Sequence, residues 1–176
     1  MNILVPNLGS TSLKYQILEM PAERVLARGR LERVRDYGQA IGEIQSGGAA
    51  IDAVAFKTVH GGPRFRGAFR ADPGVLAALE EFLPAAPAHN SIYLLGIRAF
   101  QDALPGVPLV AAFETEFHAT LPEHARAYGV PRAWREAGVE RYGFHGASHR
   151  YVSERVAGML GRESRLVSCH LGGSSS

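Results

Sequence analysis

The chain has 176 residues and a net charge of only +2, with 46% hydrophobic and 20% charged residues. This composition is typical of a globular protein and excludes a disordered, collagen-like or coiled-coil chain. The longest apolar run covers residues 107–113, far fewer than the ~20 residues that a membrane span needs. Because no signal peptide is visible either, we expect a cytoplasmic protein without a membrane partner. The single cysteine, Cys169, excludes an internal disulfide and a multi-cysteine metal site.

The basic residues are almost all arginine, since only Lys14 and Lys57 are lysines. A lysine in such a background can mark a position where the chemistry needs a compact ammonium charge. The arginines are scattered except for a cluster within residues 24–35. Their alternation in a strand-like stretch is typical of a solvated face rather than a nucleic-acid groove, so no nucleic-acid partner is expected.

The hydrophobic pattern predicts an antiparallel meander at the N-terminus, with strands at residues 2–6, 13–20 and 25–34. Farther along, capping and periodicity signals predict helices at residues 38–46, 72–83, 90–104 and 146–160. Strands are expected at residues 52–59, 107–113 and 165–171. Because strands alternate with helices after an antiparallel start, the sequence predicts an α/β domain.

Three loops that follow predicted strands are rich in small or polar residues, at positions 7–12, 60–62 and 172–176. Small residues let backbone N–H groups approach an anion, and hydroxyls add further donors. Each loop alone is also compatible with a simple turn. Lys14, close behind Ser12, favours a phosphate site, although neither a P-loop nor a dinucleotide-binding glycine motif is present.

Several histidines stand near the ends of predicted elements. His145 and His149 are spaced i,i+4, which could place two metal ligands on one helix face, but no third ligand is apparent. Donation to phosphate oxygens suits these positions better, with capping or packing as the alternative. Glu114 and Glu116 follow the apolar strand, where ligands bind in α/β folds. There a carboxylate could orient a nucleophile or hold Mg²⁺, or belong to a solvated turn.

Blocks of sequence then carry a resemblance to a known family. They are Asn7-x-Gly9-Ser10-Thr11-Ser12-x-Lys14, Val59-His60-Gly61-Gly62, Pro87-Ala88-His89-Asn90, residues 113–118 (FETEFH), residues 142–149 (YGFHGASH) and His170-Leu171-Gly172. In this order they resemble the N-terminal half of acetate kinase and its short-chain acyl kinase relatives. The first block matches the family's Asn-x-Gly-Ser-Ser-Ser-x-Lys signature with one conservative change.

The resemblance implies an α/β fold of the actin/sugar-kinase/Hsp70 (ribonuclease H-like) type, with a mixed sheet flanked by helices. Residues 1–164 would form the N-terminal domain, and residues 165–176 would begin a second domain that is truncated here. The implied reaction is direct in-line phosphoryl transfer from ATP to acetate, propionate or butyrate, with Mg²⁺ as the metal.

The resemblance also implies roles for individual residues. Asn7 would support the metal and the phosphates. The implied phosphate and nucleotide contacts are Ser10, Ser12, Lys14, His170 and Gly172. The implied catalytic residues are Glu114, His145 and Lys57, of which Lys57 would pair with the substrate carboxylate. The implied lining of the acyl pocket is Val59, Ala88 and Phe144.

The chain departs from the family pattern at three functional positions. Glu114 replaces an aspartate, Lys57 an arginine, and Gly173 an asparagine. Ala88 also stands where a larger apolar residue is usual, which favours a roomier acyl pocket. Because family members are about twice as long, the missing C-terminal half or a complementing chain would have to complete the site, and we expect the chain alone to be inactive. The alternative is a non-catalytic remnant or anion-binding module of the same fold.

Overall fold

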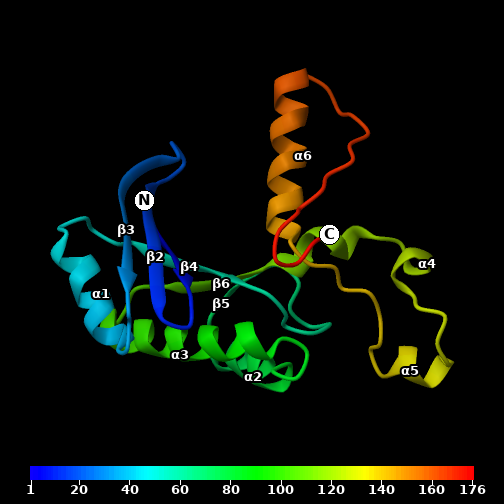
Figure 1. Ribbon diagram of the computed structural model, residues 1–176, viewed down its shortest axis with the longest axis horizontal. Helices are drawn as coiled ribbons and strands as arrows, with labels where there is room; N and C mark the ends of the chain where they lie inside the picture. Colours follow the sequence, from blue (N-terminus) through cyan, green and yellow to red (C-terminus); the bar gives the residue numbers. More distant parts are fainter. The chain divides into compact units, whose positions relative to one another are not determined.

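The computed structural model describes residues 1–176, apart from the side chain of Ala88. The chain forms two compact units, Met1–Phe113 and Glu114–Ser176 (Figure 1). No helix in the described residues is long and apolar enough to cross a membrane. The domain boundary expected near residue 164 stays a prediction, because compact packing units need not coincide with evolutionary domains.

The first unit is built on one six-stranded sheet. Its strands are β1 (Asn2–Leu8), β2 (Ser12–Glu19), β3 (Arg24–Glu32), β4 (Ala53–Thr58), β5 (Ala68–Arg70) and β6 (Leu109–Phe113), in the order β3-β2-β1-β4-β6-β5. β4 runs parallel to both β1 and β6, whereas the other pairs are antiparallel. The predicted meander and mixed sheet are therefore confirmed, and the short edge strand β5 is an addition.

Three helices accompany the sheet: α1 (Tyr37–Ser46), α2 (Pro73–Glu81) and α3 (Pro87–Ala103). The side chains of Asp36 and Asp72 accept backbone hydrogen bonds at the starts of α1 and α2, which satisfies donors that have no partner within the helix. α3 contacts β1, β4 and β6 along one face of the sheet (Figure 1). There Phe100 packs edge-on against Phe56 of β4 at 5.2 Å.

Alternation along the strands separates a buried face from an exposed one. Leu4, Leu13 and Phe56 are fully buried on the side of the core. The intervening side chains of Lys14 and Lys57 are exposed. Lys14 and Lys57 therefore lie on the sheet face opposite the helices.

The second unit contains short helices and one long helix. Its elements are the 3-10 helix η1 (Glu114–Thr120), α4 (Glu123–Arg126), α5 (Arg132–Glu136) and α6 (Gly146–Leu160). The predicted boundaries of α6 are confirmed. The strand expected at residues 165–171 is wrong: this segment has no regular secondary structure, and Val167 is 89% exposed. A segment with a strand pattern forms a strand only when a neighbouring strand takes its backbone hydrogen bonds, and the described residues of this unit contain no strand.

Candidate functional site

The loop between β1 and β2 is closed by backbone hydrogen bonds. The amide of Gly9 donates to the carbonyl of Ser12 at 2.8 Å, and the hydroxyl of Tyr37 donates to the carbonyl of Gly9 at 3.0 Å. A Cβ at position 9 would lie only 2.8 Å from the Ser12 hydroxyl oxygen, so glycine permits this tight turn. The turn leaves the predicted phosphate contact Ser10 exposed at its tip.

The hairpin register brings two predicted site residues together. Asn7 on β1 lies opposite Lys14 on β2, and both are exposed. Side chains opposite each other on antiparallel strands lie on the same face about 5 Å apart at Cβ. The side chains of Asn7 and Lys14 thus start from neighbouring positions beside the turn that carries Ser10 and Ser12.

The segment after β4 packs tightly. His60 is only 5% exposed, and its Nδ1 accepts a hydrogen bond from the Gly62 amide at 3.0 Å. The fully buried side-chain amide of Asn90 donates to the carbonyl of His60 at 3.1 Å. Burial, and secondarily the charge of Arg66, lowers the pKa of His60. The neutral imidazole of His60 therefore acts as a buried hydrogen-bond acceptor that stabilises the loop after β4.

The residues predicted to line the acyl pocket and to bind the substrate carboxylate differ in their exposure. Val59 is 4% exposed and packs in the core. Lys57 is exposed one strand away from Asn7, since β4 neighbours β1. The side chain of Ala88 lies outside the described residues, and Phe144, in the second unit, is 44% exposed.

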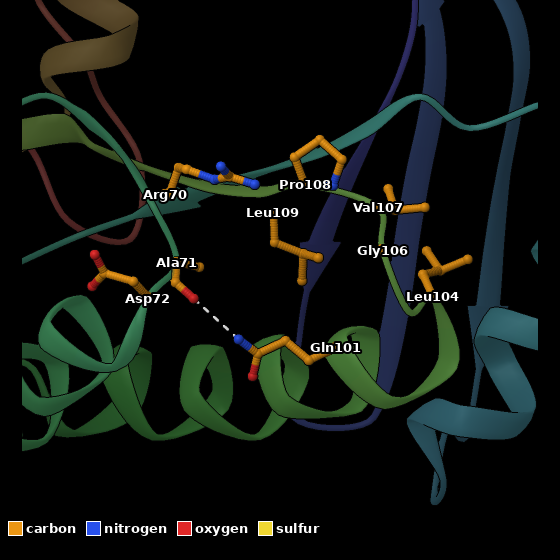
Figure 2. A pocket seen from close by; sticks show the side chains of 9 residues that line it. All are labelled: Arg70, Ala71, Asp72, Gln101, Leu104, Gly106, Val107, Pro108 and Leu109. Atoms are coloured by element: carbon orange, nitrogen blue, oxygen red, sulfur yellow. Dashed lines mark hydrogen bonds between the residues drawn. The ribbon is translucent and has the colours of Figure 1, made fainter.

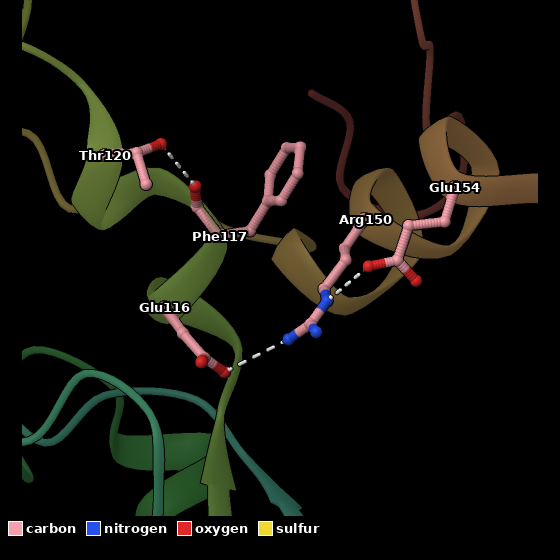
Figure 3. A network of polar contacts seen from close by, with 5 residues as sticks. All are labelled: Glu116, Phe117, Thr120, Arg150 and Glu154. Carbon is pink, nitrogen blue, oxygen red and sulfur yellow. Dashed lines mark hydrogen bonds and ion pairs between the residues drawn. The ribbon is translucent and has the colours of Figure 1, made fainter. Parts of the chain in front are cut away.

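In the second unit, an ion-pair network joins η1 to α6. Arg150 donates from Nε to Glu154 at 2.9 Å, and its guanidinium lies 3.6 Å from the Glu116 carboxylate (Figure 3). The paired carboxylates raise the pKa of Arg150. Glu114, the predicted catalytic carboxylate, begins η1 and is 6% exposed.

The start of α6 brings together two predicted site residues. His145 precedes the helix in the left-handed conformation, with φ of 55°. Its ring stacks on that of His170 with centroids 4.0 Å apart and an interplanar angle of 9°. Its Nδ1 lies 2.9 Å from the Ser176 hydroxyl and its Nε2 3.1 Å from that of Ser174. Gly172, in the terminal loop, is exposed.

Two further histidines complete this cluster. His149 has Nδ1 at 3.0 Å from the hydroxyl of Ser168 and Nε2 at 2.8 Å from that of Ser176. The Ser176 hydroxyl therefore bridges His145 and His149. His118 packs edge-on against His149 at 6.0 Å, and the Nδ1 of His170 lies 3.0 Å from the hydroxyl of Ser148.

The cluster is a hydrogen-bonded set of imidazoles and serine hydroxyls. Among the described residues, no group of three or more His, Cys, Asp or Glu side chains could hold a metal ion. Mg²⁺ commonly takes one or two protein oxygens together with substrate phosphates and water. The exposed amide oxygen of Asn7 fits that role, and no all-protein cage is required.

A separate cavity of about 420 Å³ lies in the first unit beside the amino end of β6 (Figure 2). It is lined by residues before β6 and by Arg70, Asp72 and Gln101. Within this lining, the side-chain amide of Gln101 donates a hydrogen bond to the carbonyl of Ala71 at 3.0 Å (Figure 2). Ligands of α/β folds bind at the carboxyl ends of parallel strands, and this cavity adjoins the amino end of β6. It is therefore not the candidate site.

Comparison with known proteins gives consistent relatives. The family model described as the acetokinase family matches residues 39–176. The acetate kinase of Thermotoga maritima is 40% identical over an alignment covering 100% of this chain and 53% of the relative, and that of Geobacillus kaustophilus is 39% identical. The chain thus spans about half the length of these curated relatives.

Solved structures of an acetate kinase and a propionate kinase are similar to this chain over nearly its whole length. The crystal structure of Porphyromonas gingivalis acetate kinase superimposes with a TM-score of 0.85 at 35% identity, covering 99% of this chain and 53% of that one. A propionate kinase from Francisella tularensis gives a TM-score of 0.88 at 27% identity, with the same coverage. With its sequence blocks and its mixed α/β fold, the chain belongs to the acetokinase family.

Proposed function

We propose that this chain supplies one half of an acyl kinase, which transfers the γ-phosphoryl group of ATP to the carboxylate of acetate or a close homologue. A carboxylate oxygen forms the new bond to the γ-phosphorus. The bond between the γ-phosphorus and the β,γ-bridging oxygen breaks, and ADP leaves with that oxygen. Family membership and the relatives named acetate and propionate kinase support the reaction class. A cytoplasmic location, where ATP is available, is part of this proposal.

The observation that carries the proposal is the stacked pair His145 and His170 with serine hydroxyls at their ring nitrogens. Phosphoryl transfer asks little covalent chemistry of the protein, because charge spreads over the three equatorial oxygens of the transferring group. Catalysis then depends on donors fixed where that charge develops. Two imidazoles held parallel, with Ser174 and Ser176 beside them, are a source of such donors.

The first unit supplies complementary groups. The turn carrying Ser10 and Ser12 offers backbone and hydroxyl donors to phosphate oxygens, and Lys14 adds a point charge. Mg²⁺, when bound with the phosphates, would neutralise charge there, with Asn7 as its protein oxygen. Lys57 would hold the substrate carboxylate and Glu114 would orient the reacting groups. The acyl pocket would include Val59, Ala88 and Phe144.

The substitutions at functional positions bear on rate. A lysine holds a carboxylate through a point charge, whereas an arginine can bind both oxygens in a fork. Glu114 keeps a carboxylate but places it one methylene farther from the backbone than aspartate. A misplacement of about 1 Å can cost about 10²-fold in rate, so we expect slower turnover than an arginine and an aspartate would give.

The test is a chimera in which residues 1–176 replace the matching half of the Thermotoga maritima acetate kinase. Acyl phosphate is trapped as the hydroxamate with ATP, Mg²⁺ and acetate, propionate or butyrate. We expect product from the chimera and none from the chain alone. The variants Lys57→Arg and Glu114→Asp separate two histories: a gain in rate indicates a decayed kinase, and a loss indicates a retuned one. A folded chimera that makes no product with any acid, even with both variants combined, leaves the alternative of a non-catalytic remnant.

A further inference from the structure

The exposed face of the sheet that carries Asn7 and Lys14 also carries two arginines. On the next strand, Arg30 lies opposite Lys14, and Arg28 lies opposite Gln16. Asn7, Lys14 and Arg30 therefore form one line across β1, β2 and β3. Arg28 and Arg30 are exposed, whereas the glycine and leucine that alternate with them are half-buried. We call Lys14, Arg28 and Arg30 the basic row.

The charges of the basic row are not balanced within the chain. Arg30 forms an ion pair with Glu32. For Lys14 and Arg28, the described residues provide neither an ion pair nor a hydrogen bond to the side chain. Two positive charges thus remain uncompensated on adjacent strands.

This arrangement is unfavourable without an anion. Neighbouring strands are about 4.8 Å apart and residues two apart on one strand about 6.8 Å apart, which is within the screening length of about 8 Å at physiological salt. Lys14 and Arg28 are diagonal neighbours across the antiparallel pair, at a spacing of about 7–8 Å. Their like charges therefore repel each other within that screening length. An anion bound across the row would remove that repulsion.

The row borders a cavity that can accommodate such an anion. The cavity measures about 660 Å³ and is lined by the whole row together with Asn7, Gln16 and Val5. Its size lies within the range of about 300–1,000 Å³ usual for small-ligand sites. Guanidinium groups bind phosphoryl oxygens in a bidentate fork, and an ammonium group adds a further charge-assisted donor. Three cationic side chains over two strands suit an anion longer than a single phosphate.

We propose that the basic row is a binding site for a diphosphate group. The site shares Lys14 with the proposed phosphoryl site and rests otherwise on Arg28 and Arg30, to which the family resemblance gives no role. The diphosphate can be inorganic or part of a nucleotide, because the recognising chemistry is the same for both.

Calorimetric titration of the full chain tests the proposal, with Mg²⁺ absent and ionic strength held constant. Inorganic diphosphate, ADP and adenosine are the probes. We expect diphosphate binding that Arg28→Gln and Arg30→Gln each weaken by about tenfold, because each removes a charge-assisted contact. Arg24→Gln is the matched control, since Arg24 stands on the same strand and already pairs with Glu19, and it should leave the affinity unchanged.

The probes also identify the source of the ligand. ADP binding more tightly than inorganic diphosphate, with adenosine silent, assigns the row to a nucleotide; the reverse order assigns it to the inorganic anion. Absence of diphosphate binding to the folded chain overturns the proposal. An equal loss of affinity in Arg24→Gln and Arg28→Gln overturns it as well.

Stability provides a second readout. At low salt, Arg28→Gln should raise the unfolding temperature of the free chain because it relieves repulsion, and should reduce the additional stabilisation by diphosphate. An unfolding temperature that falls in the variant, together with unchanged diphosphate stabilisation, contradicts the assignment. The outcome is separable from the acyl kinase proposal: an active chimera whose basic row binds no diphosphate refutes only the row, and a diphosphate-binding chain in an inactive chimera refutes only the kinase.

Discussion

Replacing Gly146 by alanine should force the start of α6 away from η1. A Cβ at position 146 would lie 1.8 Å from the carbonyl oxygen of Glu114 and 3.1 Å from the Cβ of Phe117. Contacts of a real Cβ atom below 3.0 Å essentially do not occur. The neighbour at 1.8 Å is backbone and cannot rotate aside, so the two segments must separate by the difference, about 1.2 Å.

Two consequences follow from that displacement. Overpacking of this kind costs about 1–3 kcal/mol in the free energy of unfolding. The displaced segment also carries His145 and His149, whose rings meet the serine hydroxyls of the terminal loop. Because a misplacement of about 1 Å can cost about 10²-fold in rate, acyl phosphate formation by the chimera should fall by about that factor in Gly146→Ala.

Thermal unfolding followed by circular dichroism, together with the hydroxamate assay, checks both numbers. Gly158→Ala is the matched control, because Gly158 belongs to the same helix and a Cβ there meets nothing within 4 Å. That control should stabilise the chain by about 0.5–1 kcal/mol through helix propensity and leave the rate unchanged. Equal stability and equal rate in Gly146→Ala and Gly158→Ala would refute the reasoning.

Two further predictions concern the segment after β4. Burial lowers the pKa of His60 below its ordinary value of about 6.5, so the unfolded chain binds the proton more readily than the folded chain. The free energy of unfolding should therefore be highest above about pH 6.5 and fall as the pH drops below that value. Urea unfolding between pH 5 and 7.5 measures this loss of unfolding free energy. The loss should be smaller in His60→Gln and equal to that of the wild type in His124→Gln, a control at an exposed site. A pH dependence of stability that stays unchanged in His60→Gln would contradict the burial argument. Gly62→Ala should cost more than Gly48→Ala in thermal unfolding, because both have positive φ but only a Cβ at 62 would meet the ring of Phe82, at 2.1 Å; equal costs would show that the ring moves aside freely.

Local patterns in the sequence were sufficient for most elements of the first unit. Alternating apolar residues predicted the strands of the meander, and the capping signal at Asp72 predicted the start of α2. The cap that Asp36 provides for α1 became visible only in the structure. The hairpin turn after Asn7 also determines its pairing with Lys14. β5 was missed because three residues, Ala68–Arg70, are too short to show a period.

The second unit was harder to predict because its contacts join distant positions. Residues 165–171 satisfy a strand pattern, but the pattern does not reveal whether a neighbouring strand is present. The bridge from Ser176 to His149 spans 27 residues, and no spacing rule connects them. His145 and His170 were proposed from family motifs, and their stacking became visible only in the structure.

The burial of Val59 illustrates a different limit. The sequence places it directly after β4, where a ligand-facing residue is expected, but alternation breaks down at the strand end. Thr58, Val59 and His60 are all buried in succession. Three consecutive buried residues require packing on both sides of the backbone, which depends on α2 and α3 rather than on the local sequence.

The most direct test of the central claim is the rate of ATP-dependent hydroxamate formation by the chimera, compared with that of its His145→Ala variant. If this chain supplies the phosphoryl-facing half of an acyl kinase, the chimera forms acyl phosphate with at least one short-chain acid, and the variant loses most of that rate while remaining folded. A folded chimera whose rate does not change in His145→Ala would contradict the account.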